Sequence, residues 1–202
     1  MKKPIIEFEH LVDALRSLPG VGLKNAKKWA YHIINQDERY IKQFTDRIKF
    51  AHERIRKCSK CGNLSIELEC GICSDKNRDH STLCVVTSVE DLERIESSNS
   101  FYGLYHITNA ELTIKQNNLV KHTNLDSIYD RVKNSPEIKE IIIATSFSHD
   151  GEMTAEYICN LLKNFKELAI YRIGFGVPLN GAIDYIDDET LKCSFNFKRK
   201  LS

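Results

Sequence analysis

The stretch Cys58-Ser59-Lys60-Cys61, followed after eight residues by Cys70-Gly71-Ile72-Cys73, decides how the chain is organised. Two C-x-x-C pairs at this separation place four thiolates where one tetrahedral ion can bind. Gly62 and Gly71 are expected to relieve strain in the tight turns beside them. Four ligands leave no open position, so the spacing predicts a closed, structural Zn²⁺ site at Cys58, Cys61, Cys70 and Cys73. Four buried or redox cysteines without a metal are the alternative.

The segment that carries these cysteines, residues 57–79, is here called the knuckle and is too short to bury an apolar core. Metal–thiolate bonds would supply the folding free energy that apolar burial does not supply there. We therefore expect the knuckle to join two larger parts. The predicted fold class is α/β, with a helical part at residues 1–56, a mostly parallel sheet at residues 80–173 and a C-terminal extension at residues 174–202.

The composition is that of a globular protein in a reducing compartment. Of the 202 residues, 42% are hydrophobic and 28% are charged, which suits a folded chain rather than a disordered one. No apolar run reaches about 18 residues and no signal-peptide pattern opens the sequence, so a cytoplasmic protein without membrane contact is expected. Cys84, Cys159 and Cys193 lie outside the knuckle and are expected to be reduced core thiols.

Charge is distributed unevenly along the chain. Residues 1–57 hold 13 Lys and Arg against 7 Asp and Glu, a net +6, whereas residues 58–202 hold 16 against 21, a net −5. Positive potential in the N-terminal part favours a polyanionic partner there. A solvated helical surface with surplus lysines is the alternative.

Apolar residues recur at helical spacing on both sides of a turn near the N-terminus. The segments 6–18 and 23–34 carry them largely three or four residues apart. Between these segments, Leu18-Pro19-Gly20-Val21-Gly22 stops the first helix, because Pro19 disfavours the α conformation at the residue before it. The pattern predicts a helix-hairpin-helix. A third helix is expected over residues 38–56. Its basic outer face is expected to be solvated, with a binding stripe as the alternative.

The turn of this hairpin has the features of a phosphate-binding site. Gly20 and Gly22 leave room for a phosphate, and free N–H groups at the start of the second helix point toward it. Lys24, Lys27 and Lys28 stand beside that opening and can each contact a phosphate. We therefore expect DNA binding that is independent of sequence and sensitive to salt. A loop that contacts nothing is the alternative.

Beyond the knuckle, short apolar runs alternate with helical patterns. Strands are expected at residues 83–86, 105–108, 140–144 and 169–173, and helices at 89–96, 126–134 and 150–162. The order βαβαβαβ predicts a mostly parallel sheet covered by helices. Ligands of such sheets meet the loops at the carboxyl ends of the strands.

The loop after the third of these strands, residues 145–152, carries two acids. Asp150 and Glu152 could hold Mg²⁺ through water and phosphate oxygens. They also suit a helix start, with Asp150 as N-cap and Glu152 as a first-turn acid. We favour the helix start, because a working metal site needs a further carboxylate and Thr87, at the end of the first strand, does not supply one.

Several motifs occur together in one order and carry a resemblance to a known family. They are the hairpin from Leu18 to Lys28, the four-cysteine knuckle, Leu83-Cys84-Val85-Val86, Gly103-Leu104-Tyr105-His106, Ala144-Thr145, Gly151-Glu152-x-Thr154-Ala155 and Arg172-Ile173-x-x-Gly176-Val177-Pro178. Together they resemble the RecR family of bacterial recombination mediators over nearly the whole chain.

The resemblance implies a helix-hairpin-helix, a zinc finger, a Toprim domain and a C-terminal extension that act in recombinational DNA repair. Family members form ring-like tetramers able to encircle DNA, and they work with RecO and RecF to load RecA onto single strands at gaps. By the family's pattern, Lys24 and Lys28 contact DNA, and Asp150 and Glu152 form the acidic Toprim loop. The family usually has Glu where this chain has Thr87, which argues against a metal-dependent activity.

Our interpretation of the sequence is a non-enzymatic, DNA-binding scaffold. The hairpin binds phosphates, the zinc knuckle fixes its angle to the Toprim-like part, and the acidic second part recruits a partner. A Mg²⁺-dependent nicking or topoisomerase-like Toprim enzyme and a zinc-bearing protein–protein adaptor are the two alternatives. The polar segment 109–124, where the family has a Gly/Pro-rich segment, is expected to form a long surface loop.

Overall fold

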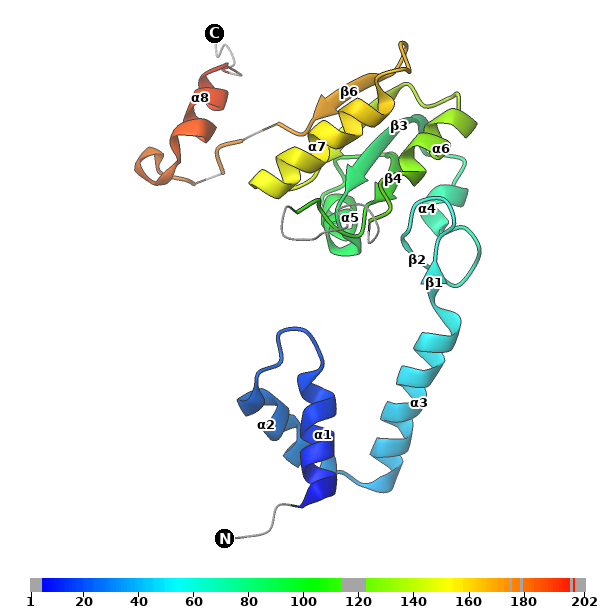
Figure 1. Cartoon of the computed structure of the whole chain (residues 1–202), viewed down its shortest axis with the longest axis vertical. Helices are drawn as coiled ribbons and strands as arrows, with labels where there is room; N and C mark the ends of the chain where they lie inside the picture. Colours follow the sequence, from blue (N-terminus) through cyan, green and yellow to red (C-terminus); the bar gives the residue numbers. More distant parts are fainter. Residues whose placement is uncertain (1–4, 114–122, 175, 179, 197, 199–202) are drawn as a thin grey trace. The chain divides into compact units, whose positions relative to one another are not determined.

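A computed structural model describes residues 5–113, 123–174, 176–178, 180–196 and 198, and Figure 1 shows its backbone. The chain forms two compact units, Met1–Ile55 and Arg56–Ser202. Within the described ranges, no helix is both long and apolar enough to cross a membrane. The surface loop predicted over 109–124 lies partly outside the description, at residues 114–122.

The first unit consists of α1 (Ile6–Arg16), α2 (Leu23–Ile34) and α3 (Glu38–Arg54). α1 and α2 pack against each other through a small core of Val12, Ala26 and Ala30. Alanine has the smallest apolar side chain, so the two on α2 let the helices approach closely. These two helices form the predicted hairpin.

α3 begins with a side-chain cap and ends where a strand begins. Its N-cap is Asp37, whose carboxylate accepts a hydrogen bond from Tyr40 N at 2.7 Å. The helix ends at Arg54, two residues earlier than predicted, because Arg56 and Lys57 form the short strand β1.

The second unit opens with the knuckle. β1 (Arg56–Lys57) pairs antiparallel with β2 (Leu64–Ser65), and the four-residue helix α4 (Gly71–Ser74) follows. The four cysteines form a buried cluster of their own, with Ile72 packed against it. Such a small apolar contact agrees with a segment that depends on a metal for its folding.

A four-stranded parallel sheet follows, built from β3 (Asp79–Val86), β4 (Gly103–Ile107), β5 (Glu140–Ala144) and β6 (Ala169–Arg172). The strands lie in the order β4-β3-β5-β6, so β3 and β5 are central and β4 and β6 are the edges. The last residue of β3, Val86, is in register with Ile107 and Ala144. The carboxyl ends of these three strands therefore lie side by side.

Helices cover both faces of the sheet. α6 (Ser127–Asn134) and α7 (His149–Leu162) pack on one face, in a core that includes Val85, Ile141 and Ile158. α5 (Val89–Ser97) packs on the other face against Val86, through Leu92. The side chains of alternate residues of β3 therefore pack on opposite faces of the sheet. A short 3-10 helix, η1 (Ile183–Tyr185), and α8 (Asp188–Asn196) follow the sheet.

The predicted α/β architecture and the order of its elements are confirmed. β3 and β4 begin earlier than predicted, at Asp79 and Gly103. The reason in β3 is that residues 79–82 are polar and precede the apolar run that identifies the strand in the sequence.

Candidate functional site

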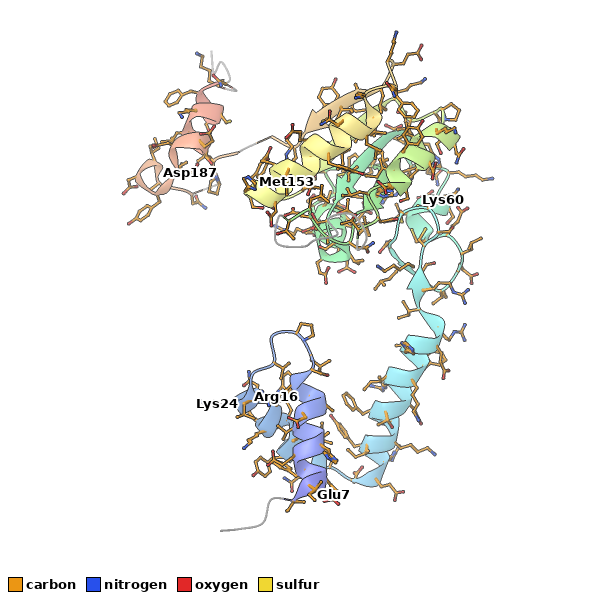
Figure 2. The ribbon with its side chains drawn as sticks, viewed as in Figure 1. Glu7, Arg16, Lys24, Lys60, Met153 and Asp187 are labelled. Atoms are coloured by element: carbon orange, nitrogen blue, oxygen red, sulfur yellow. The ribbon has the colours of Figure 1, made fainter. Side chains whose placement is uncertain are left out.

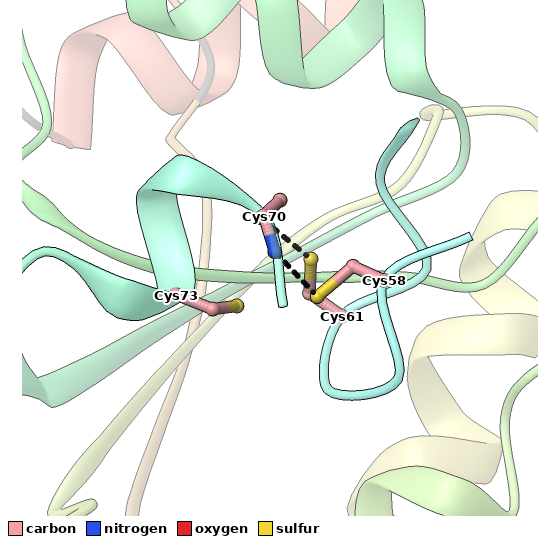
Figure 3. A group of neighbouring side chains, drawn as sticks. All are labelled: Cys58, Cys61, Cys70 and Cys73. Atoms are coloured by element: carbon pink, nitrogen blue, oxygen red, sulfur yellow. Dashed lines mark hydrogen bonds between the residues drawn. The ribbon is translucent and has the colours of Figure 1, made fainter. Parts of the chain in front are cut away.

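The four cysteines of the knuckle meet in space, as Figure 3 shows. Their sulfur atoms all lie within 4.8 Å of one another, and none of the four residues is more than 4% exposed. The Sγ atoms of Cys61 and Cys70 are 3.5 Å apart. Tetrahedral geometry with zinc–sulfur bonds of about 2.3 Å requires a separation of about 3.8 Å. The cluster can therefore hold one tetrahedral metal ion.

Backbone N–H groups of the knuckle already point at the sulfurs. Cys70 N donates to Cys58 Sγ at 3.2 Å, and Asn63 N donates to Cys61 Sγ at 3.4 Å. The hydrogen bond from Asn63 lowers the pKa of Cys61, against larger contributions that raise it. The turn after Cys61 requires Gly62, whose φ is +83°. Gly71 was expected in a similar turn, but it has no positive φ and is the first residue of α4.

Without a cation, the thiols of Cys61 and Cys73 resist ionisation. The pKa of Cys61 is raised, because its thiol is hydrogen-bonded to Cys70 and Cys73 and is buried. The pKa of Cys70 is lowered, because Cys61 and Cys73 donate hydrogen bonds to its thiolate. Contact with Cys61 lowers the pKa of Cys73, but contact with Cys70 and burial raise it, to about 12 overall. A divalent cation would offset the repulsion between four thiolates, so the donor set fits a thiophilic metal ion.

In the first unit, the turn between α1 and α2 presents a helix start without a side-chain cap. Gly20 adopts a φ of +77°, which favours glycine, and Gly22 is the N-cap of α2. A Cβ atom at either glycine would meet no atom within 4 Å, so the space beside the turn is open. The first N–H groups of α2 are therefore accessible to an anion.

Three lysines follow this helix start. Lys24 and Lys28 are exposed and Lys27 is half-buried, and Figure 2 shows the side chain of Lys24 on α2. In the described part of the chain, none of the three forms an ion pair with a carboxylate. Their charges remain available to an external anion. DNA contact by these residues stays a prediction.

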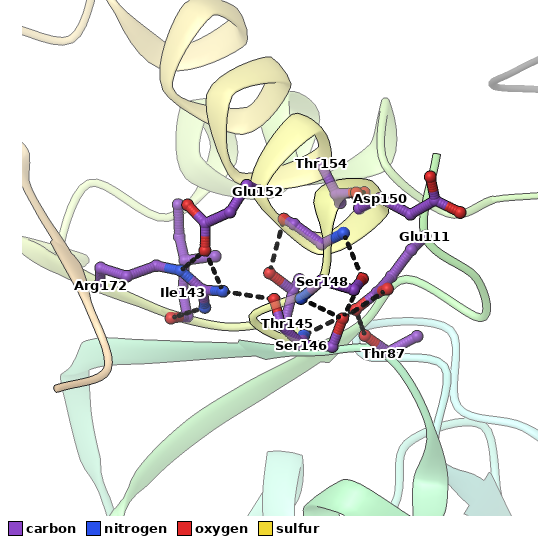
Figure 4. A network of polar contacts seen from close by, with 11 residues as sticks. Thr87, Glu111, Ile143, Thr145, Ser146, Ser148, Asp150, Glu152, Thr154 and Arg172 are labelled. Carbon is purple, nitrogen blue, oxygen red and sulfur yellow. Dashed lines mark hydrogen bonds and ion pairs between the residues drawn. The ribbon is translucent and has the colours of Figure 1, made fainter. Parts of the chain in front are cut away.

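The loop after β5, residues 145–152, leads into α7 at the carboxyl ends of the strands (Figure 4). The N-cap of α7 is Ser148, whose Oγ accepts from Gly151 N at 3.2 Å, and not Asp150 as the sequence suggested. The Asp150 carboxylate is 43% exposed and lies 3.9 Å from His149 Nδ1. Glu152 is paired with Arg172, with 2.9 Å between Oε1 and Nη2.

Arg172, at the end of β6, fixes this loop from one side. Its Nη1 donates to Ile143 O at 2.9 Å, and its Nη2 donates to Ser146 O at 2.6 Å. The guanidinium also lies over the ring of Phe147, 4.4 Å from the ring centroid. Gly151 allows the loop to lie against α7, because a Cβ atom there would be 2.0 Å from Ser146 O.

Glu111 fixes the loop from the other side and is a residue that sequence reasoning missed. Its carboxylate accepts hydrogen bonds from Thr87 Oγ1 (3.2 Å), Ser146 N (2.6 Å) and Ser146 Oγ (2.9 Å). The carboxylate that Thr87 does not supply thus comes from the segment after β4. The sequence offers one signal for this position, an acid three residues beyond the end of a predicted parallel strand.

The acids at the strand ends do not gather around a common point. Among the described residues, the cysteine cluster is the one group of at least three His, Cys, Asp or Glu side chains close enough to share an ion. Glu152 forms an ion pair with Arg172, and Glu111 accepts hydrogen bonds from Thr87 and Ser146. Among the residues that the structure describes, Asp150 therefore has no second free carboxylate beside it, and the arrangement fits Mg²⁺ poorly.

The parallel sheet, its loop at the strand ends and the N-terminal hairpin define a Toprim-domain protein with a helix-hairpin-helix. The family described as Toprim domain matches residues 81–174. The family described as RecR, helix-hairpin-helix matches residues 8–52.

Curated relatives are similar over most or all of the chain. Recombination protein RecR of Ureaplasma urealyticum serovar 10 is 57% identical over 201 residues, which cover 100% of this chain and 99% of the relative. Recombination protein RecR of Ureaplasma parvum serovar 3 is 56% identical with the same coverage. That of Limosilactobacillus reuteri is 34% identical over 181 residues, or 90% of each chain. The chain therefore belongs to the RecR family.

Proposed function

We propose that the chain is a DNA-binding recombination mediator that acts in recombinational DNA repair and catalyses no reaction itself. The observation that carries the proposal is the open start of α2 beside three lysines that form no ion pair with a described residue, in a chain that belongs to the RecR family. The relatives' name, recombination protein, supports the same biological process.

In this proposal the hairpin turn binds the phosphate backbone of double-stranded or gapped DNA. Gly20 and Gly22 let a phosphate approach the N–H groups of α2. Lys24, Lys27 and Lys28 add positive charge beside it. Phosphate contacts carry no sequence information, so affinity should be similar for different sequences and should fall steeply with salt.

We assign Zn²⁺ as the structural metal of the knuckle, one ion per chain. Four thiolates are the ligands of closed tetrahedral zinc sites, and they leave no position for a substrate. Cys58, Cys61, Cys70 and Cys73 would hold the ion. When bound, zinc supplies folding free energy to a segment without an apolar core.

The acidic loop at the strand ends is proposed to bind protein partners. Side chains of Asp150 and Glu152 are 43% and 55% exposed. Their charge suits a basic surface on a RecO-type partner, with RecF as a further partner and RecA as the protein loaded at single-stranded gaps. We further propose that copies of the chain assemble into a tetrameric ring in the cytoplasm.

In this proposal, each of four segments of the chain has its own role. Residues 1–56 bind DNA, residues 57–79 form the zinc finger, residues 80–173 form the Toprim domain, and residues 174–202 extend it. The Toprim nicking enzyme has less support, because Thr87 is not an acid and Glu111 is engaged by Ser146. The adaptor without DNA contact leaves the charge of the hairpin lysines unexplained.

The test is a titration of a labelled gapped duplex with the zinc-loaded chain and Mg²⁺, run on native and denaturing gels. We expect a complex that weakens with salt and leaves the strands intact. The double variant Lys24→Glu, Lys28→Glu should bind about tenfold more weakly or worse, because two phosphate contacts are lost. Cut strands would support the enzyme alternative.

The matched control is Lys163→Glu with Lys166→Glu, an exposed pair in the second unit. It changes the net charge by the same amount and should leave the affinity nearly unchanged. An equal loss in both double variants would contradict the assignment of DNA binding to the turn.

A further inference from the structure

β4 is an edge strand whose outer side is covered by the knuckle and by residues around α6. Ile107 N donates to Cys61 O at 2.8 Å, and Ile107 O accepts from Asn124 Nδ2 at 3.3 Å. Tyr105 O accepts from Arg131 Nη1 at 2.5 Å. Buried backbone groups require such partners, and here they come from outside the sheet. The knuckle therefore belongs to the hydrogen-bond pattern of the second unit.

Arg131, on α6, contacts the knuckle as well as the strand. Its Nη1 also donates to Lys60 O at 2.8 Å, inside the first C-x-x-C pair. Its Nη2 lies 3.9 Å from Cys73 Sγ. The planar guanidinium presents several donors in a fixed geometry, so one side chain reaches the strand, the knuckle loop and a sulfur together.

The positive charge of Arg131 is directed at the cysteine cluster. Within the described ranges it has no carboxylate ion-pair partner. Lys60, which lies between the first two cysteines, pairs with Glu69 at 2.9 Å instead. Four thiolates around a divalent ion leave two negative charges uncompensated, and a guanidinium beside one sulfur offsets part of that charge.

We propose that Arg131 is a positioning residue of the metal centre, which slows metal release and couples metal occupancy to the protection of β4. The inference rests on the proposed zinc site and is independent of DNA binding and of partner binding. Groups that orient metal ligands from outside the coordination sphere typically change metal affinity about 10- to 100-fold when they are removed.

The test measures zinc transfer to a chromogenic chelator from the full chain and three variants. Arg131→Gln should release zinc about tenfold faster or more. Arg131→Lys should have a smaller effect, because it keeps the charge but loses the planar fork. Lys133→Gln removes an exposed cation from the same helix and should release zinc at the parent rate.

A second readout is hydrogen exchange over residues 103–107. In the parent chain, removal of zinc should speed up exchange there, and in zinc-loaded Arg131→Gln exchange should already be faster. The proposal would be overturned if Arg131→Gln released zinc within about twofold of the parent rate and lost only thermal stability. The hydrogen bonds of Arg131 would then stabilise the fold without acting on the metal centre. Exchange over residues 103–107 that is insensitive to zinc would overturn it too.

Elemental analysis of the parent chain tells whether a failed prediction refutes the role of Arg131 or the zinc site itself. Stoichiometric zinc is expected. A parent chain purified without metal would refute the zinc site itself, whereas a zinc-loaded chain with normal release from Arg131→Gln would refute only the role of Arg131.

Discussion

The cysteine cluster and the loop after β5 are both polar sites, but they are assembled in different ways. The cluster takes its four ligands from the consecutive residues 58–73. The loop is fixed by Glu111 and Arg172, and Glu111 in turn accepts a hydrogen bond from Thr87. These three residues come from other strands or the segments that follow them. The geometry of the cysteine cluster is therefore set by the spacing of its residues along the chain. The geometry of the loop after β5 is set by the register of the strands in the sheet. Substitutions should damage the first site locally and the second through the sheet.

Removal of one cysteine should break the cluster and have the largest effect. Cys61→Ser removes a fully buried ligand, so the metal should be lost together with several kcal/mol of unfolding free energy. Metal content and thermal unfolding measure the change. Cys193→Ser, outside the cluster, is the control and should alter neither quantity. Full metal retention by Cys61→Ser would contradict a four-cysteine site.

A buried histidine on β4, the strand beside the knuckle, provides a pH test. His106 is fully buried, and its Nδ1 has no partner in the described part of the chain. Burial lowers its pKa from 6.5 to about 4, the hydrogen bond with Asn124 opposes this change, and the charge of Arg131 assists it. The folded chain therefore binds its proton at lower pH than the unfolded chain.

The unfolding free energy should consequently be highest above pH 6.5 and should decline as the pH falls toward about 4. The decline from this residue should be about 3 kcal/mol. His106→Gln keeps a donor for Asn124 O and should lose this part of the pH dependence in denaturant unfolding. Comparison with the parent chain removes the contribution of the cysteines, and equal slopes in the two chains would refute the assignment.

Gly151→Ala should disturb the strand-end loop without touching the cluster. Because the new Cβ would lie 2.0 Å from Ser146 O, the loop or the start of α7 must move. We expect a loss of about 2 to 4 kcal/mol in urea unfolding, with normal metal content. Gly174→Ala, where a Cβ meets no atom within 4 Å, should cost less than about 0.5 kcal/mol. A metal loss in Gly151→Ala would show that the two sites are not independent.

The smallest effect should come from the contact between Glu111 and Ser146. Glu111→Ala, Ser146→Ala and the double variant form a cycle whose coupling energy should be about 1 kcal/mol, since the Ser146 Oγ donates to a carboxylate. Denaturant unfolding of the four chains measures it. A coupling energy near zero would mean that Glu111 does not hold the loop through this hydroxyl.

The cluster, the hairpin turn and the order of strands and helices along the chain could be predicted from the sequence, because each depends on residues close together along the chain. Glu111 and Arg172 could not be placed, since their contacts with Ser146 exist only once β4, β5 and β6 are in register. The prediction of Asp150 as the N-cap of α7 was wrong for a related reason. Ser148 and Asp150 are both good caps, and the length of the turn after β5 selects Ser148.

The cover that the knuckle gives to β4 also bears on how the protein behaves when metal is scarce. A strand edge without partners is a template onto which another chain can add. Chains synthesised without enough metal to fill the cysteine cluster should therefore aggregate through this edge before later metal binding can restore the cover. The yield of usable protein would then depend on the metal supply of the cell, in addition to the rate of synthesis.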